Sequence, residues 1–168
     1  KKLGGKSSFY FAKRQKSLAE VNGYIFDNFA VEFEYHDGQR MFGQARQING
    51  CQNKVEEAVV GTQGESNCRD WITSGGDRWR FRGEKVNAYR QEHENLIASV
   101  RAGEPINEAQ TIAEATMTGI LGREAAYSGK EIGWEEAMKS TMRLGPEKLE
   151  FGDYPIQPVA MPGKYKFS

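Results

Sequence analysis

The stretch from Gly103 to Ser140 constrains the fold more than any other part of the chain, because it carries a long helical pattern with recognisable ends. Apolar residues recur there at intervals of three and four, which predicts one helix with a single buried stripe. We expect Asn107 to cap this helix with Gln110 as its capping-box partner, and Gly129 to end it in the left-handed conformation. The stripe consists of Ala109, Ile112, Ala113, Thr116, Met117, Ile120 and Leu121. The helix is predicted to be the central packing element.

Two glycines, Gly119 and Gly122, lie within this helix. A glycine in a helix interior costs about 1 kcal/mol relative to alanine, so it is usually kept where another backbone comes close. A short further helix is expected to open at Gly133, because two glutamates fill its first turn and the helix dipole favours negative charge there.

An earlier helix is predicted from Asn87, which can accept at its N-terminus, to Gly103. Its apolar face includes His93, for which a hydrogen-bonded core residue and a catalytic base are both open interpretations. Pro105 fixes the bend into the long helix. The two helices are therefore expected to form a hairpin that covers one face of a sheet.

Residues 26–35 alternate between apolar and polar, which predicts a half-buried strand, and Asp37-Gly38 is typical of a two-residue hairpin loop. Residues 40–48 are the predicted return strand. A two-residue loop would pair Val31 with Gln44 and Phe29 with Arg46, on one face. Polar residues opposite apolar ones would mark one end of the sheet as a candidate ligand cleft. The alternative is an arginine that extends to the rim of the sheet.

Three more strands are predicted at residues 54–62, 65–73 and 78–82, so the sheet is expected to be antiparallel and built from neighbours. The glycines at positions 61 and 64 resemble a phosphate-binding loop, but no helical stripe follows them, as such a loop requires. Trp79 and Phe81 alternate with arginines. This pattern can indicate single-stranded nucleic acid, but it is also that of an ordinary amphipathic strand. The net charge of zero favours the strand.

Residues 1–24 are predicted to be an irregular lead-in truncated from an upstream domain, within which the run Phe9 to Phe11 is either a strand remnant or a loop. Four of the five prolines follow residue 145, which predicts an extended C-terminal strap over the domain, with a flexible tail as the alternative. The predicted fold is thus α+β: an open, mostly antiparallel sheet, a helical hairpin on one face and a proline-containing strap, formed by residues 25–168.

The composition excludes several classes of function. The chain has 23 basic residues (lysine plus arginine) and 23 acidic residues (aspartate plus glutamate). Its net charge is therefore zero, and no overall positive potential indicates nucleic acid or an anionic membrane as a partner. No apolar run approaches the roughly 20 residues of a membrane helix. The two cysteines and two histidines lack the spacing of a zinc site, so no metal site is predicted. Two unpaired thiols favour the cytoplasm, with an exported protein that has lost its signal as the alternative.

Several segments together resemble a known family. They are QEHENLIASVR (residues 91–101), PINEAQTIAEATMTGILGREAA (residues 105–126), YSGKEIGWEEAMKS (residues 127–140), the strand of residues 29–35 with its turn, and the closing PGKY (residues 162–165). They resemble the C-terminal domain of the glucose-fructose oxidoreductase and inositol dehydrogenase family (Gfo/Idh/MocA), in one of its bacterial branches. The resemblance covers nearly everything after about residue 24.

The resemblance implies a two-domain enzyme in which an N-terminal Rossmann domain binds NAD or NADP. The C-terminal domain of such an enzyme covers a sugar or cyclitol substrate and often forms the oligomer contact through its sheet. It also implies a catalytic lysine in a Glu-Lys-Pro motif. This chain contains neither that motif nor a GxGxxG sequence. We therefore expect no catalytic residue, no bound cofactor and no Rossmann domain within these residues.

On this interpretation the chain is the substrate-covering part of an NAD(P)-dependent oxidoreductase, inactive alone. The hairpin geometry suggests a substrate-side surface of Gln44, Arg46 and Gln47, with Asn53 beyond it and His93 as a further candidate. Amides and guanidinium groups make the several hydrogen bonds that hydroxyl-rich ligands need. The alternatives are an NAD-dependent glycosidase of the same family and a stand-alone dimerisation or carbohydrate-binding module.

Overall fold

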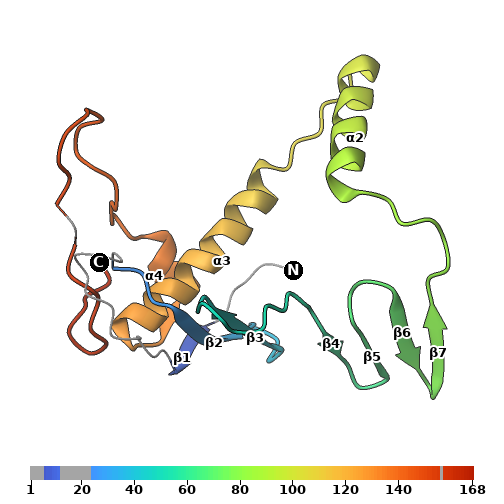
Figure 1. Cartoon of the computed structure of the whole chain (residues 1–168), viewed down its shortest axis with the longest axis horizontal. Coiled ribbons are helices and arrows are strands. Elements are labelled where there is room, and N and C mark those ends of the chain that lie inside the picture. The colour runs from blue at the N-terminus through green and yellow to red at the C-terminus, as the bar shows by residue number, and fades with distance from the viewer. Residues whose placement is uncertain (1–5, 12–23, 156) are drawn as a thin grey trace. The chain divides into compact units, whose positions relative to one another are not determined.

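The computed structural model describes residues 6–11, 24–155 and 157–168, which fall into two compact units (Figure 1). The first unit combines residues 1–49 with residues 108–168, and the second comprises residues 50–107. Each unit contains one antiparallel sheet, and helices occur in both. The predicted α+β class with antiparallel sheets is confirmed, although the single expected sheet is divided between the two units.

The sheet of the first unit has the strand order β3-β2-β1-β8. Its strands are β1 (Lys6–Phe11), β2 (Asn28–Glu34), β3 (Arg40–Arg46) and the short β8 (Ile132–Gly133). β1 pairs with β2 on one side and β8 on the other, so it lies inside the sheet. The prediction of an irregular lead-in is therefore wrong for residues 6–11. A strand was the alternative for Phe9 to Phe11 with an upstream partner, but β1 is longer and both of its partners follow it in the sequence. The rest of that lead-in, up to residue 23, lies outside the described residues.

The register of the hairpin between β2 and β3 differs by one residue from the prediction. Val31 pairs with Gly43 and Ala30 pairs with Gln44, because the loop is longer than Asp-Gly alone. The amide of Gly38 donates to the carbonyl of Tyr35 at 2.9 Å, and Gly38 has a φ of 80°. Since a shift of one residue moves every side chain to the other face, Gln44 and Arg46 do not share the face of Val31 as predicted.

The long helix α3 (Ala109–Ser128) packs on β1 and β2. Gly129 ends it with a φ of 67°, as predicted, but the helix begins after Glu108, one residue later than the cap predicted at Asn107. Gln110 instead donates to Glu114 within the helix at 2.9 Å. Only the second half of α3 is buried: Leu121 is fully covered, whereas Ile112, in the same predicted stripe, is 60% exposed.

The core of the first unit consists of two groups of side chains. Phe26, Val31, Phe33, Ala126 and Tyr127 form the group between β2 and α3. A Cβ on Gly122 would lie 2.8 Å from Cζ of Phe33, so this glycine is needed because a phenyl ring presses on the helix. The expected close approach of another backbone is not observed, because the atoms nearest to Gly122 belong to side chains. At Gly119 a Cβ would meet nothing within 4 Å.

The second group joins α3 to the segment that follows it. Leu121 and Ala125 of α3 pack with Ile132 of β8 and with Ala137 of the short helix α4 (Trp134–Met138). This helix begins after Gly133 with two glutamates in its first turn, as predicted. The group therefore fixes the last turns of α3 against the edge strand of the sheet.

The C-terminal segment beyond residue 140 contains no helix or strand among its described residues. Val159, Ala160 and Tyr165 pack on the first core group, and the amide of Gly163 donates to the carbonyl of Ser128 at 2.8 Å. The predicted strap is thus observed over residues 159–165. The middle of the segment is different, because Leu149 is 95% exposed.

The second unit is a meander followed by a helix. The strands β4 (Val59–Val60), β5 (Gly64–Ser66), β6 (Trp71–Ser74) and β7 (Asp77–Arg80) pair in sequence order. They are shorter than predicted, because the loop between β5 and β6 interrupts the expected strand of residues 65–73. In that loop Oδ1 of Asn67 accepts from the backbone amides of Arg69, Asp70 and Trp71 at 3.1–3.2 Å.

The helix of the second unit, α2 (Ala88–Ala102), is capped at both predicted ends. Oδ1 of Asn87 accepts from the amide of Arg90 at 3.2 Å, and Gly103 has a φ of 71°. No residue of α2 is buried. The expected helical hairpin is not formed within one unit, since α2 and α3 fall in different units and α3 is the long helix that covers the sheet.

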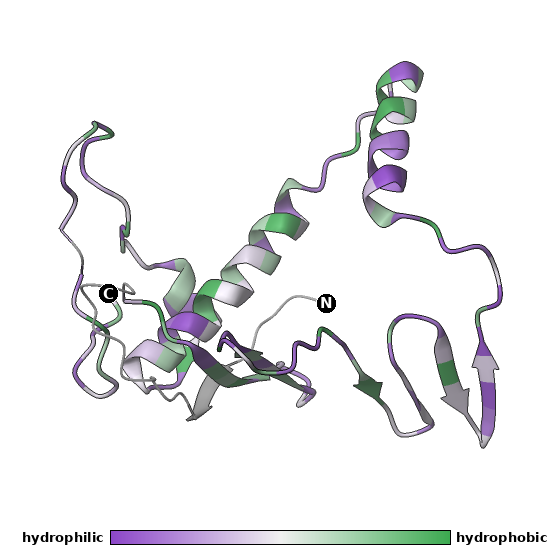
Figure 2. Cartoon of the chain, viewed as in Figure 1, coloured by the Kyte–Doolittle hydropathy of each residue, from purple (hydrophilic) through white to green (hydrophobic). Residues whose placement is uncertain are grey.

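The structure describes every residue from 50 to 107, and none of them is buried. Figure 2 shows hydrophobic residues on β4, β6 and α2, where a packed domain would hide them. The most exposed of the large ones are Val55, Val60, Tyr89 and Val100. The second unit therefore has secondary structure without a hydrophobic core of its own.

Candidate functional site

A pocket of about 730 Å³ lies wholly within the first unit, between the sheet, α3 and the C-terminal segment. Its floor is formed by the face of β2 that carries Val31, by Gly43 and Ala45 of β3, and by Gly119 and Gly122 of α3. Small residues on β3 and α3 leave room above the sheet. Its aromatic lining consists of Tyr24, Phe29, Phe33, Tyr127, Tyr154 and Tyr165. A pocket of this volume falls in the range of about 300–1,000 Å³ that small-molecule sites occupy.

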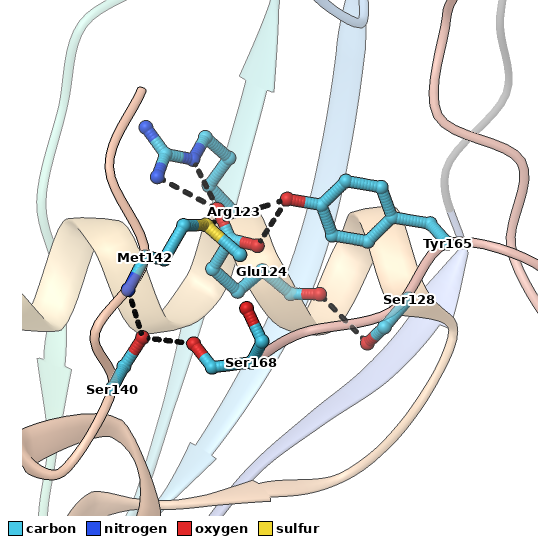
Figure 3. Close-up of polar contacts among 7 residues, drawn as sticks. All are labelled: Arg123, Glu124, Ser128, Ser140, Met142, Tyr165 and Ser168. Atoms are coloured by element: carbon cyan, nitrogen blue, oxygen red, sulfur yellow. Dashed lines mark hydrogen bonds and ion pairs between the residues drawn. The ribbon is translucent and has the colours of Figure 1, made fainter. Parts of the chain in front are cut away.

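One edge of the pocket carries a charged cluster built around Glu124, which is 1% exposed (Figure 3). Oε1 of Glu124 accepts from Nε of Arg123 at 2.8 Å and lies 2.7 Å from its Nη2. Oε2 accepts from the hydroxyl of Tyr165 at 2.8 Å. Both carboxylate oxygens are thus satisfied, which a buried charge requires. The cluster also ties the C-terminal segment to α3.

Ionisation of two tyrosines at this pocket is disfavoured. Burial, followed by the hydrogen bond to Glu124 and its charge, raises the pKa of Tyr165 to about 12. Burial is also the main cause that raises the pKa of Tyr127 above its usual value. A tyrosine is already neutral near pH 7, and the raised pKa values keep both phenols neutral to higher pH, so that the hydroxyl of Tyr165 remains a hydrogen-bond donor to the carboxylate.

Arg143 supplies a second cation to the lining of the pocket. It is exposed, and it forms no ion pair with any residue that the structure describes. The described lining residues contain Arg123, Arg143 and Glu124 as their charged groups. Since Arg123 and Glu124 neutralise each other, the described lining retains the positive charge of Arg143.

Three of the five residues predicted to contact a substrate lie at or just after the end of β3, where Gln44 and Arg46 share the face of the sheet away from Val31. Gln44 borders the pocket, but its pairing with Ala30 directs its side chain to the opposite face of the sheet. Arg46 and Gln47 are exposed, and the amide of Gln47 donates to the carbonyl of Asp27 at 2.8 Å.

The other two predicted residues belong to the second unit. Asn53 is exposed. His93 is also exposed, with Nδ1 2.7 Å from the carbonyl of Tyr89 in its own helix, and no residue of α2 is buried. The interpretation of His93 as a core residue is therefore not observed, and the catalytic base stays a prediction.

Sequence reasoning missed Arg123, Glu124, Arg143 and Tyr165. A glutamate in a helix is usually interpreted as a solvent-exposed residue. The partner of Glu124, Tyr165, lies 41 residues away in the sequence. One signal was present: Arg123 and Glu124 directly follow the most apolar part of the helical stripe, where a charged pair requires partners.

The glycine turn before β5 does not form a phosphate site. The amide of Gly61 donates to the carbonyl of Gly64 at 2.8 Å, and a strand follows, not a helix N-terminus. Among the described residues, no three His, Cys, Asp or Glu side chains gather closely enough to hold a metal ion. No helix in the described part of the chain is long and apolar enough to span a membrane.

Comparison of the chain with models of protein families, with curated proteins and with solved structures finds no match. The functional conclusions therefore depend on the pocket and on the sequence resemblance.

Proposed function

We propose that this chain is the substrate-covering part of an NAD(P)-dependent oxidoreductase that acts on a sugar or cyclitol, and that it is inactive alone. The pocket of the first unit carries this proposal, because it combines aromatic walls with a polar edge. Aromatic rings pack against the C–H face of a sugar ring, while arginine, glutamine and tyrosine side chains bond its hydroxyls. The sequence resemblance to the Gfo/Idh/MocA family supports the same class of substrate.

The residues of this chain do not fit a dinucleotide. A dinucleotide site requires a glycine-rich turn between a strand and a helix N-terminus, and the sequence contains no two glycines separated by one residue. The turn at Gly61 leads into β5. The cofactor would therefore be held by a different domain, and no step of the reaction is assigned to residues of this chain.

Calorimetric titration of the purified chain tests this proposal. We expect no tight binding of NAD(H) or NADP(H) and no turnover of sugars or inositols with either cofactor. We expect neutral sugars to perturb the NMR signals of pocket residues such as Tyr24, Tyr154 and Leu144. Tight dinucleotide binding or turnover by this chain alone would overturn the proposal. A glycine-rich strand-to-helix turn encoded immediately upstream of Lys1 would support it.

The absence of buried residues in the second unit favours a second candidate function, a dimerisation module. Val60 and Tyr89 there are 79% exposed, and on the first sheet Phe42 is 66% exposed on the face away from α3. Covering such surface would stabilise a dimer by about 25 cal/mol for each Å² of apolar area. Light scattering over a range of concentrations separates the candidates, since a monomer at high concentration argues against the dimerisation module.

A further inference from the structure

We propose that the pocket of the first unit binds a sugar that carries one carboxylate, such as an aldonate or a uronate. This inference rests on the proposed function, which it narrows from sugars in general to acidic sugars. It follows from the charges that line the pocket, from the geometry of those groups and from the aromatic walls.

Glu124 is the acidic residue of the described lining. Its two oxygens are occupied by Arg123 and by the hydroxyl of Tyr165, with the polar atoms 2.7–2.8 Å apart. An anionic ligand therefore meets a carboxylate whose charge is already balanced. Arg143 has no such partner among the described residues, so it is the group that attracts the ligand.

The geometry of guanidinium groups favours a carboxylate. The planar fork of an arginine donates two parallel hydrogen bonds to the two oxygens of a carboxylate. One carboxylate also matches the positive charge of Arg143, which the described lining leaves uncompensated. A sugar phosphate would bring close to two negative charges, and the largely apolar walls would leave the excess charge poorly solvated.

The walls of the pocket suit the rest of such a ligand. Tyr24, Tyr154 and Gln157 line the pocket. A tyrosine supplies both an aromatic ring and a hydroxyl, and a glutamine amide both donates and accepts. The carboxylate would lie at Arg143, with the C–H face of the sugar on the rings. This arrangement makes charge the property that selects the ligand.

Titration of the whole chain with glucuronate, glucose and glucose 6-phosphate, followed by NMR, tests the inference. We expect glucuronate to bind about tenfold more tightly than glucose. This preference should fall as salt is added, because Arg143 is exposed. Arg143→Gln should reduce the affinity for glucuronate to that for glucose. Arg101→Gln, an equal loss of charge on α2 in the second unit, should leave the preference intact.

Each result has a distinct meaning. Equal binding of glucose and glucuronate, or a preference that survives Arg143→Gln, overturns the inference while sugar binding by the chain still stands. Tighter binding of glucose 6-phosphate overturns the assignment to a carboxylate. If none of the three compounds perturbs the pocket signals, the sugar-binding role in the proposed function fails as well. Near-ultraviolet circular dichroism confirms that the variants keep the fold.

Discussion

Replacement of Glu124 by glutamine tests whether the charged cluster holds the first unit together. The carboxylate is 1% exposed and bonds Arg123 and Tyr165 at once. Removing one partner of a buried ion pair typically costs about 3–5 kcal/mol. The side chain of Arg123 is 32% exposed, so water compensates part of this loss. We therefore expect Glu124→Gln to lower the free energy of unfolding by about 2–3 kcal/mol.

Urea unfolding followed by the fluorescence of Trp134 measures this loss, because Trp134 packs beside the core of the first unit. Trp71 and Trp79 are replaced by phenylalanine in every variant so that Trp134 is the single reporter. The control is Glu147→Gln, an exposed glutamate of the same unit, which should change the free energy by less than about 0.5 kcal/mol.

A second measurement isolates the contact with Tyr165. The charge of Glu124 contributes to the raised pKa of this phenol, so Glu124→Gln should lower that pKa toward the usual value, with burial still keeping it raised. Absorbance titration of tyrosinate follows the change, and Tyr165→Phe identifies the step. The reasoning is refuted if Glu124→Gln unfolds at the same urea concentration as the parent, or if the phenol titrates unchanged.

Three further predictions concern other parts of the chain. Gly122→Ala places a Cβ against the phenyl ring of Phe33 and should lower the free energy of unfolding by about 1–3 kcal/mol. Gly119→Ala places its Cβ in open space and should raise the free energy of unfolding by up to about 1 kcal/mol. Urea unfolding of both variants measures the two changes. Stability should fall as the pH rises from about 10 to about 12, because the unfolded chain releases the proton of Tyr165 first, and Tyr165→Phe should flatten that decline in unfolding curves. In the second unit the hydrogen bond from Asn67 is the main cause of the lowered pKa of Asp70, so Asn67→Ala should raise that pKa in a carboxyl NMR titration, and an unchanged value would exclude the contact.

The ends of the helices could be predicted because they depend on single residues. Gly103 and Gly129 adopt positive φ, which other residues avoid, and Asn87 caps α2 with its own side chain. The register of the first hairpin could not be predicted in the same way. Asp37-Gly38 fits both a two-residue loop and the longer turn observed, in which Gly38 donates to the carbonyl of Tyr35. That difference of one residue places Gln44 and Arg46 on the face of the sheet opposite Val31, not on the same face as predicted.

The pocket depends on contacts that local patterns do not encode. Its position is set where the C-terminal segment crosses α3, and the bond between Tyr165 and Glu124 joins residues 41 positions apart. The periodicity of the sequence shows which side of α3 is apolar. It does not show which part of that side is buried by other elements. Leu121 is fully buried and Ile112 is 60% exposed, although both belong to one stripe. A candidate site formed by such tertiary contacts becomes visible only in the structure.

In the second unit, local sequence signals predicted a helix correctly but did not show whether its apolar face is buried. Its helix α2 has good caps at Asn87 and Gly103 and a side-chain pair between Arg90 and Glu94 at 2.7 Å. Such local terms contribute about 1 kcal/mol or less each, and an isolated helix of 15 residues is marginal in water. Burying a leucine or valine side chain contributes about 1.5–3 kcal/mol, but Leu96 and Val100 stay exposed. The amphipathic sequence of α2 therefore specifies a helix whose stability depends on a surface that covers its apolar face.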